Sequence, residues 1–276
     1  MKRKTKMTIL NVLKEALAWS LSLIVIVPFL IVLVNALKDE QQALTMSFSL
    51  PTQWHWENFV TVWNVGHIPQ SFFNSVLISV GAVFLSIICA SLCAFVLARN
   101  PSKCNKKIFM YFSLGLMFPV SMVTVVKVMR ILGLYNTRWG VILLFGALIL
   151  PLSVFLYYNF IMGIPQEIDE AAIVDGAGTG TLFFRILFPV LKPVTVTVVM
   201  LNFLSCWNDF TVPLYILPDP DKAVIVQQVY HFYGTFTASW NLVSVTILYA
   251  IAPILAVYIL GQRYIISGMV AGAVKG

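Results

Sequence analysis

The feature that most limits the fold of this chain is a series of apolar runs, each about twenty residues long or longer. Hydrophobic residues make up 59% of the sequence and charged residues only 11%. A soluble domain carries about 25% charged residues, so the chain is too apolar for that class. A helix needs about 20 apolar residues to cross the hydrocarbon core of a bilayer. The sequence therefore predicts a protein that crosses a membrane several times.

The apolar runs are expected to be helices, because lipid offers the backbone no hydrogen-bond partners. The short alternating segments typical of an outer-membrane barrel are not found in the sequence. We therefore predict an all-α polytopic membrane protein with six transmembrane helices. These cover residues 16–37, 71–97, 108–131, 139–162, 193–217 and 240–262.

The lysines and arginines predict which way the spans run. With six spans, 13 of these 18 residues lie on the side of the N-terminus and five on the other side. Basic residues favour the cytoplasmic side, so both termini are expected there. The prediction is a cytoplasmic segment at 1–15, a membrane domain at 16–262 and a cytoplasmic tail at 263–276. The net charge of +7 is explained by these orienting residues, and nucleic acid is not an expected partner.

The longest outside segment, residues 38–70, carries Trp54, Trp56 and Trp63. Tryptophan favours the headgroup level of a bilayer, which indicates an interfacial segment. Docking of an external protein is the alternative. The four cysteines show no metal-ligand spacing and the three histidines do not cluster, so neither a metal site nor catalytic residues are predicted.

A charged stretch, "EIDEAAIVDGAGTG" at 167–180, interrupts the apolar sequence between the fourth and fifth runs. Acidic residues favour the positive end of a helix dipole, alanines favour the helix itself, and Gly176 supplies a stop. A short helix of about ten residues from Pro165 is expected. Its positions 168, 171, 172 and 175 share one face, whose small side chains would let another protein approach closely.

The string "EAAIVDGAGTGTLFFRILFPVLKP" resembles the EAA signature of ABC importer permeases. The matching residues are Glu170, Ala171, Ala172, Gly176, Ile186 and Pro189. Phe188 stands where the pattern has leucine, which keeps a large apolar side chain. The strings "NSVLIS", "AFVLARNP", "LGLYNTRWG", "CWNDFTVPL" and "QRYIISGMVAGAVKG" resemble the carbohydrate-uptake branch, and its smaller, maltose-type permease subunit most closely.

This resemblance implies a type I importer fold in which the loop at 163–192 forms a coupling helix seated in a groove of a separate ATPase. The residues implied in that contact are Glu170, Ala171, Ala172, Asp175 and Gly176. The implied partners are a second homologous permease, a cytoplasmic ABC ATPase dimer and an extracytoplasmic sugar-binding protein, in a bacterial cell membrane. ATP and Mg²⁺ would be bound by the ATPase, and no cofactor by this chain.

Three other functions are alternatives. An ABC importer permease for another class of solute would share the same loop. A stand-alone secondary transporter would need two repeated halves with matching broken helices and deep charges, of which the six runs show little. A membrane-embedded enzyme would need converging acid–base or metal residues in the spans.

Several polar residues near the outer ends of the third and fifth runs are candidates for the transport pathway. Asp209 lies about 24 Å along the fifth run at 1.5 Å per residue, and a charge at that depth marks a functional candidate. Lys127 and Arg130 share one helical face toward the same side. A salt bridge from Asp209 to one of them is expected, with contact to the sugar or the second permease as the alternative.

Three further residues of the fifth run are candidates either for the pathway or for contacts between helices. Asn202 and Asn208 are polar positions that could line a cavity, and Trp207 could stack on a sugar ring or pack within the protein. Pro213 is expected to bend this run, and bent helices suit moving gates.

Overall fold

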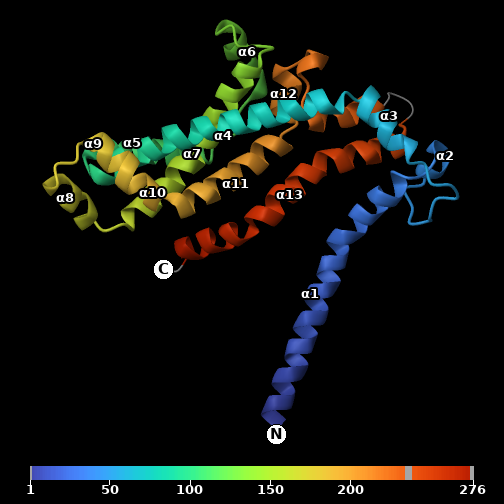
Figure 1. Cartoon of the computed structure of the whole chain (residues 1–276), viewed down its shortest axis with the longest axis horizontal. Coiled ribbons are helices and arrows are strands. Elements are labelled where there is room, and N and C mark those ends of the chain that lie inside the picture. Colours follow the sequence, from blue (N-terminus) through green and yellow to red (C-terminus); the bar gives the residue numbers. More distant parts are fainter. Residues whose placement is uncertain (1, 234–237, 274–276) are drawn as a thin grey trace. The chain divides into compact units, whose positions relative to one another are not determined.

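The computed structural model describes residues 2–233 and 238–273, and Figure 1 shows its helices in order along the chain. The chain forms two compact units. The first unit contains the residues up to Ile68 together with Gln228–Ile251, and the second contains Pro69–Gln227 and the residues from Ala252 on. In the described residues, every regular element is helical apart from an isolated bridge between Tyr233 and Ala238.

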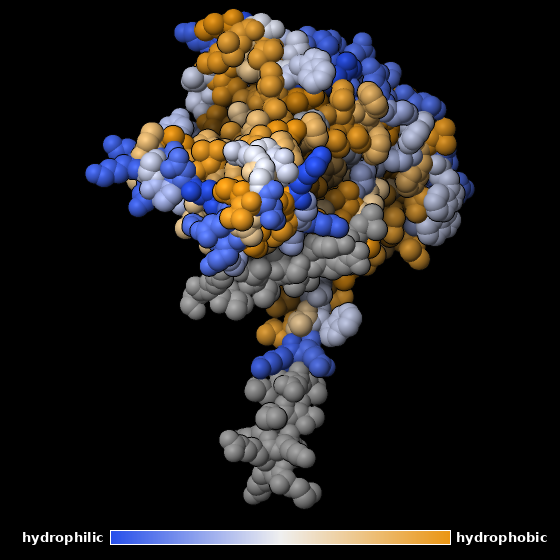
Figure 2. Space-filling model, turned by 60° about the vertical axis from the view of Figure 1, so that its left-hand side comes forward, coloured by the Kyte–Doolittle hydropathy of each residue, from blue (hydrophilic) through white to orange (hydrophobic). Residues whose placement is uncertain are grey.

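Within the part of the chain that the structure describes, four helices are long and apolar enough to cross a membrane. They are α1 (Lys2–Asn35), α4 (Ile68–Arg99), α7 (Arg138–Met162) and α13 (Trp240–Ala273). They confirm the first, second, fourth and sixth predicted runs as helices. α13 continues through most of the stretch that was expected to be a tail. Apolar side chains are exposed along α1, Trp19 among them at 71%, and hydrophobic residues cover much of the surface in Figure 2.

The first unit joins α1, α2 (Glu40–Ala43), α3 (Glu57–Val65) and the beginning of α13 through buried polar side chains. The Asn58 side-chain amide donates to the carbonyls of Ala36 and Lys38, at 3.0 and 2.9 Å. Lys38 is fully buried, and its ammonium donates to the Ser47 carbonyl at 2.7 Å. These bonds fix the segment after α1 by local contacts. The three tryptophans of this segment are exposed, so both interpretations of them stay predictions.

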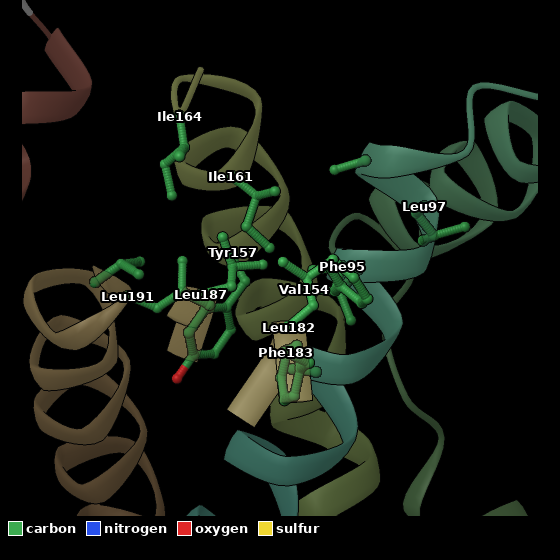
Figure 3. Close-up of a cluster of buried hydrophobic side chains, with 14 of the residues drawn as sticks. Phe95, Leu97, Val154, Tyr157, Ile161, Ile164, Leu182, Phe183, Leu187 and Leu191 are labelled. Carbon is green, nitrogen blue, oxygen red and sulfur yellow. The ribbon is translucent and has the colours of Figure 1, made fainter. Parts of the chain in front are cut away.

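The core of the second unit gathers apolar side chains from α4, α7 and the loop region that follows α7 (Figure 3). Phe95 lies near Val154, and Tyr157 faces Leu187 and Leu191 in this view. Val154, Tyr157, Leu187 and Leu191 are all completely buried. This cluster determines where the loop between α7 and α11 can pack, and it lies at the end of α4 that holds the candidate site.

The third predicted span is not one helix in this structure. It consists of α5 (Lys103–Gly115) and α6 (Met122–Ile131), with six non-helical residues between them. Pro119 in this gap has no N–H to donate, and it restricts the residue before it to extended backbone. Neither helix alone reaches the length of a span, so the expectation of a continuous third helix is wrong.

The fifth predicted span is interrupted as well. It consists of α11 (Lys192–Asn208) and α12 (Thr211–Ile216). In a continuous helix Pro213 would clash with the carbonyl of Asp209 four residues earlier, and Asp209 instead has extended backbone (φ −73°, ψ 116°). The predicted effect of Pro213 is thus present as a break rather than a gentle bend. α12 packs beside α6 and α7.

A second break lies before α11 and is caused in the same way by Pro193. The helical segment Thr179–Val190 meets α11 at an angle of 74°, and the pair counts as a fifth membrane span if the two are taken together. The segment comprises α9 (Thr179–Thr181), the π-helix η1 (Leu182–Leu187) and α10 (Phe188–Val190). The wide turn of η1 precedes Pro189, whose ring would clash with the Arg185 carbonyl in an α-helix.

The remaining short elements of the chain are α8 (Glu167–Val174) and the 3₁₀-helices η2 (Pro220–Lys222) and η3 (Ile225–Phe232). In Figure 1, α8 lies at the end of the second unit where α4 ends and α5 begins. The charged loop predicted from the sequence therefore projects from the end of the helices and is not embedded among them.

Candidate functional site

The candidate site is α8, the short helix that the charged stretch predicts. It begins at Glu167, two residues after Pro165, and contains eight residues rather than about ten. Its acidic first turn favours the positive end of the helix dipole. Because the first N–H groups of a helix lack intrahelical partners, these carboxylates lie where they stabilise the start of the helix. The predicted helix is therefore confirmed, with a slightly later start.

The end of α8 is a Schellman motif, in which the two residues after the helix close back on its last turn. The Ala177 amide donates to the Ala172 carbonyl and the Gly176 amide to the Ile173 carbonyl, both at 2.9 Å. Gly176 has φ +83°, and a Cβ placed there would meet nothing within 4 Å. The predicted need for glycine is therefore a matter of backbone conformation, and no neighbouring group within the chain approaches it closely.

The exposed surface of α8 is partly apolar. Val174 is 87% exposed and Ile173 is 60% exposed. Glu170, Ala171 and Asp175, three of the residues implied in coupling, are exposed as well. Water-exposed aliphatic side chains on so short a helix leave an apolar surface that another molecule can cover.

Ala172 does not belong to this exposed surface, and the expectation that it shares a docking face with Ala171 and Asp175 is wrong. It is only 6% exposed and belongs to the buried cluster of Figure 3. Helical spacing places residues 168, 172 and 175 near one another, but it does not say which side packs inward. Ala172 holds α8 against the core, where α8 packs beside η1.

A charged contact that the sequence did not predict joins α8 to the end of α4. Asp169 Oδ2 lies 2.5 Å from Arg99 Nε, and Asp169 Oδ1 accepts a hydrogen bond from Arg99 Nη2 at 3.4 Å. The Nε proton is not aligned with an acceptor, so the contact at that atom is an ion pair without a directed hydrogen bond. Arg99 Nη1 also donates to the carbonyls of Ile161 and Ile164, at 3.4 and 3.1 Å.

Asn202 lies in a buried polar cluster between three long helices of the second unit. Its side-chain amide donates to Ser153 Oγ at 2.8 Å, and Ser153 Oγ lies 2.8 Å from Ser86 Oγ. All three residues are at most 2% exposed. Hydrogen bonds between helices supply specificity where lipid provides none. Asn202 therefore contacts other helices of its own chain and does not line an open cavity of it.

Trp207 and Asn208, the other two candidates of this run, differ in exposure. Trp207 is 2% exposed and packs against Phe72 and Phe203, with ring centroids 5.8 and 5.4 Å apart. Of the two alternatives, the structure therefore shows Trp207 packed within the protein. Asn208 is exposed, and its amide donates to the Leu204 carbonyl of its own helix at 2.9 Å. A pathway role for Asn208 stays a prediction.

The predicted salt bridge of Asp209 is wrong. Among the described side chains, no ion pair joins Asp209 to Lys127 or Arg130. Asp209 Oδ1 instead accepts a hydrogen bond from the Val212 amide at 2.8 Å, which satisfies a free N–H at the start of α12. Arg130 lies over the ring of Tyr135 at 4.5 Å, and Lys127 is exposed. The Asp209 carboxylate therefore stabilises the start of α12, after the helical interruption that follows α11.

A second cluster missed by the sequence analysis binds the loop after α12 to α4 and α7. Arg138 Nε donates to Asn74 Oδ1 at 2.8 Å, and the Asn74 amide donates to the Asp221 and Ala223 carbonyls at 3.1 and 3.0 Å. In the same loop, the hydrogen bond from Lys222 lowers the pKa of Asp219. The pairs that involve Asn74 are 64 to 149 residues apart, so no local pattern indicates them.

The described side chains contain no group of three or more His, Cys, Asp or Glu residues placed to hold a metal ion. The fold and the site together define a polytopic, α-helical membrane protein with an exposed short helix between spans. The chain belongs to the family of binding-protein-dependent transport system inner membrane components, whose sequence model matches residues 82–270. The resemblance found in the sequence is confirmed at this level.

Curated relatives cover nearly the whole chain. The permease protein NgcG of a diacetylchitobiose uptake system in Streptomyces coelicolor is 34% identical over 92% of this chain and 85% of its own. The melibiose/raffinose/stachyose import permease protein MelC of Bacillus subtilis is 34% identical over 91% of each chain. AmyC of Thermoanaerobacterium thermosulfurigenes, a probable permease for starch degradation products, is 31% identical over 92% of this chain and 93% of its own.

A solved structure shares the fold. It is a bacterial ABC transporter involved in the import of the acidic polysaccharide alginate, with a TM-score of 0.80 over 93% of this chain and 96% of the matched chain. The two sequences are 21% identical, so this likeness supports the fold alone. The family match and the relatives, rather than this structure, identify the chain as a multi-pass transport permease.

Proposed function

We propose that this chain is the membrane-spanning permease subunit of an ATP-driven importer for a sugar or oligosaccharide, and that it forms half of the translocation pathway. The observation that carries the proposal is α8, a short helix with exposed apolar residues, terminated by a glycine in the left-handed region. The named sugars of its relatives support the substrate class. No catalytic residues are assigned to the chain, and ATP hydrolysis is assigned to a partner.

In this proposal α8 seats in a groove of a cytoplasmic ATPase and transmits its motion to the spans. Exposed Ala171, Ile173 and Val174 supply apolar contact area, and burial of such area stabilises a complex by about 25 cal/mol per Å² before association costs. Glu170 and Asp175 supply charges that cations on the partner can pair with. The other proposed partners are a second homologous permease and an extracytoplasmic sugar-binding protein.

The test of this function is reconstitution of the chain with its ATPase, its second permease and its binding protein in liposomes. We expect ATP hydrolysis to rise when the binding protein carries one member of a panel containing diacetylchitobiose, melibiose, raffinose, maltotriose and a monosaccharide. Uptake of the same sugar should require ATP. Sugar uptake by this chain alone, without an ATPase, would contradict the proposal and favour a secondary transporter.

The proposed orientation can be tested by cysteine labelling in intact cells. Gln53 lies in the segment between the first two spans and is exposed, as is native Cys104 at the start of α5. In a Gln53→Cys/Cys104→Ser variant, a membrane-impermeant maleimide should label the new thiol from outside. In the native chain the same reagent should reach Cys104 only after permeabilisation. The reverse pattern would place α8 outside the cell and remove it from any ATPase.

A further inference from the structure

We propose that Arg99 and Asp169 form the mechanical link that passes the movement of α8 to the inner ends of α4 and α7. This inference rests on the proposed function, because it assumes that an ATPase moves α8. Asp169 lies in the first turn of α8, and Arg99 is the last residue of α4. Because a helix is a hydrogen-bonded rod, a displacement at one end of α8 or α4 moves the rest of that helix.

The guanidinium of Arg99 contacts both α8 and the end of α7. It pairs with Asp169, and its Nη1 donates to the carbonyls of Ile161, in the last turn of α7, and Ile164, just beyond that helix. The last carbonyls of a helix lack intrahelical partners, and a cation there interacts favourably with the helix dipole. A planar guanidinium with five donors can serve these acceptors together, whereas an ammonium is a point charge.

The connectivity of the chain explains why α4 needs this link. α8 follows α7 after a linker of four residues, Gly163–Gln166, so the two are tethered by the backbone. α4 ends 70 residues before Asp169, so only side chains connect it to α8. Ala172 attaches α8 to the apolar core that α4 shares, but apolar contacts can slide. The ion pair, with the hydrogen bond from Arg99 Nη2 to Asp169 Oδ1, adds a directed attachment at the end of α4.

Burial makes the pair sensitive to disruption. Each of the two side chains is 12% exposed, so solvent screens the attraction much less than it screens a surface pair. Removal of one partner leaves a charge with little water around it, which is why single substitutions of buried pairs are costly. A positioning role predicts that Asp169→Ala already loses most of the coupling. Arg99→Ala removes the same ion pair together with the bonds to the Ile161 and Ile164 carbonyls, so it should be at least as damaging.

The experiment is a double-mutant cycle with Arg99→Ala, Asp169→Ala and the double variant in the reconstituted complex. The measured quantity is the number of sugar molecules imported per ATP hydrolysed, using the panel sugar that stimulates hydrolysis most. Coupling between sites corresponds to about 5- to 150-fold changes, and we expect each single variant to lower this ratio roughly tenfold. The double variant should be no worse than the Arg99→Ala variant, because both lack every contact of the Arg99 guanidinium.

A merely structural role would reduce the amount of assembled complex and leave the ratio unchanged in the complexes that remain. Arg99→Lys keeps the positive charge but loses the planar guanidinium with its several donors. Its ratio of sugar imported to ATP hydrolysed should lie between those of the native chain and Arg99→Ala. Lys107→Ala, at an exposed lysine of the neighbouring helix α5, is the matched control and should behave like the native chain. Additive effects of the two single substitutions, or native ratios in both, would overturn the inference.

Failure of this inference can be told apart from failure of the proposed function. If Ala171→Arg, on the exposed side of α8, prevents ATPase binding while the Arg99 and Asp169 variants transport normally, only the link is wrong. If Ala171→Arg also assembles and transports normally, the partner does not grip the exposed side of α8, and the docking role proposed for that surface is wrong as well.

Discussion

Replacement of Gly176 by leucine is expected to abolish most of the coupling between ATP hydrolysis and transport while the spans still insert. Gly176 has φ +83°, and a residue with a Cβ pays about 1–2 kcal/mol in the left-handed region. That energy changes the population of the native loop by a factor of about 5–30. The leucine side chain would also project into the open space beside the proposed docking surface. The readouts are membrane level, co-purified ATPase and sugar-stimulated hydrolysis.

Two controls separate strain from bulk. Gly178 is equally open but has φ −73° and ψ 163°, which any residue adopts, so Gly178→Leu adds the same bulk without strain. Asparagine tolerates positive φ, so the Gly176→Asn variant should retain most of the activity. If Gly178→Leu is as damaging as Gly176→Leu, bulk is the cause and the argument from backbone conformation is wrong.

The sequence predicted the parts of this fold that depend on local physics. Long apolar runs gave four of the helices, because a membrane helix satisfies its own backbone over about 20 residues. The acidic start and the glycine stop of α8 act within one turn, so both were visible at residues 167–176. Pro213 marked the place where the fifth run breaks, since a proline blocks a helix from the residue four positions earlier.

Contacts between distant segments could not be predicted from local patterns in the sequence. From the sequence alone, Arg99 is one of the basic residues that orient the spans and Asp169 is one of the acids at a helix start, yet the two side chains meet across 70 positions. Asp209 was paired with the wrong group, because depth in a run indicates that a charge needs a partner but not which one. The break at residues 209–210 put a free backbone N–H within reach of its carboxylate, and the local partner was the one formed.

The position of Ala172 shows the same limit on a single helix. Periodicity placed it with neighbours on one face, and small size made that face look suitable for docking. The structure turns Ala172 toward the core and leaves Ala171, Ile173 and Val174 outside. A pattern of 3.6 residues defines faces of a helix, but the choice of the buried face depends on the cluster contributed by α4, α7 and η1.

Ala172→Arg and Ala171→Arg are therefore expected to fail in different ways. At Ala172, which is 6% exposed, added volume in a packed core alone costs about 1–3 kcal/mol, and an unpaired buried charge costs more. We expect loss of the folded permease from the membrane fraction. At Ala171 the folding cost should stay within about 0.5 kcal/mol, so a normal amount of permease should accumulate without bound ATPase.

The measurements are permease level in membranes, melting temperature in detergent and recovery of the ATPase by affinity purification. Ala172→Ser is the control for the buried site, because its hydroxyl can bond the carbonyl one turn back and adds little volume; it should assemble and transport. Normal folding of Ala172→Arg would mean that α8 does not pack on the cluster with its Ala172 side. Normal ATPase recovery with Ala171→Arg would mean that the partner grips another surface. Since the two residues are adjacent and chemically identical, different outcomes can arise only from the faces they occupy.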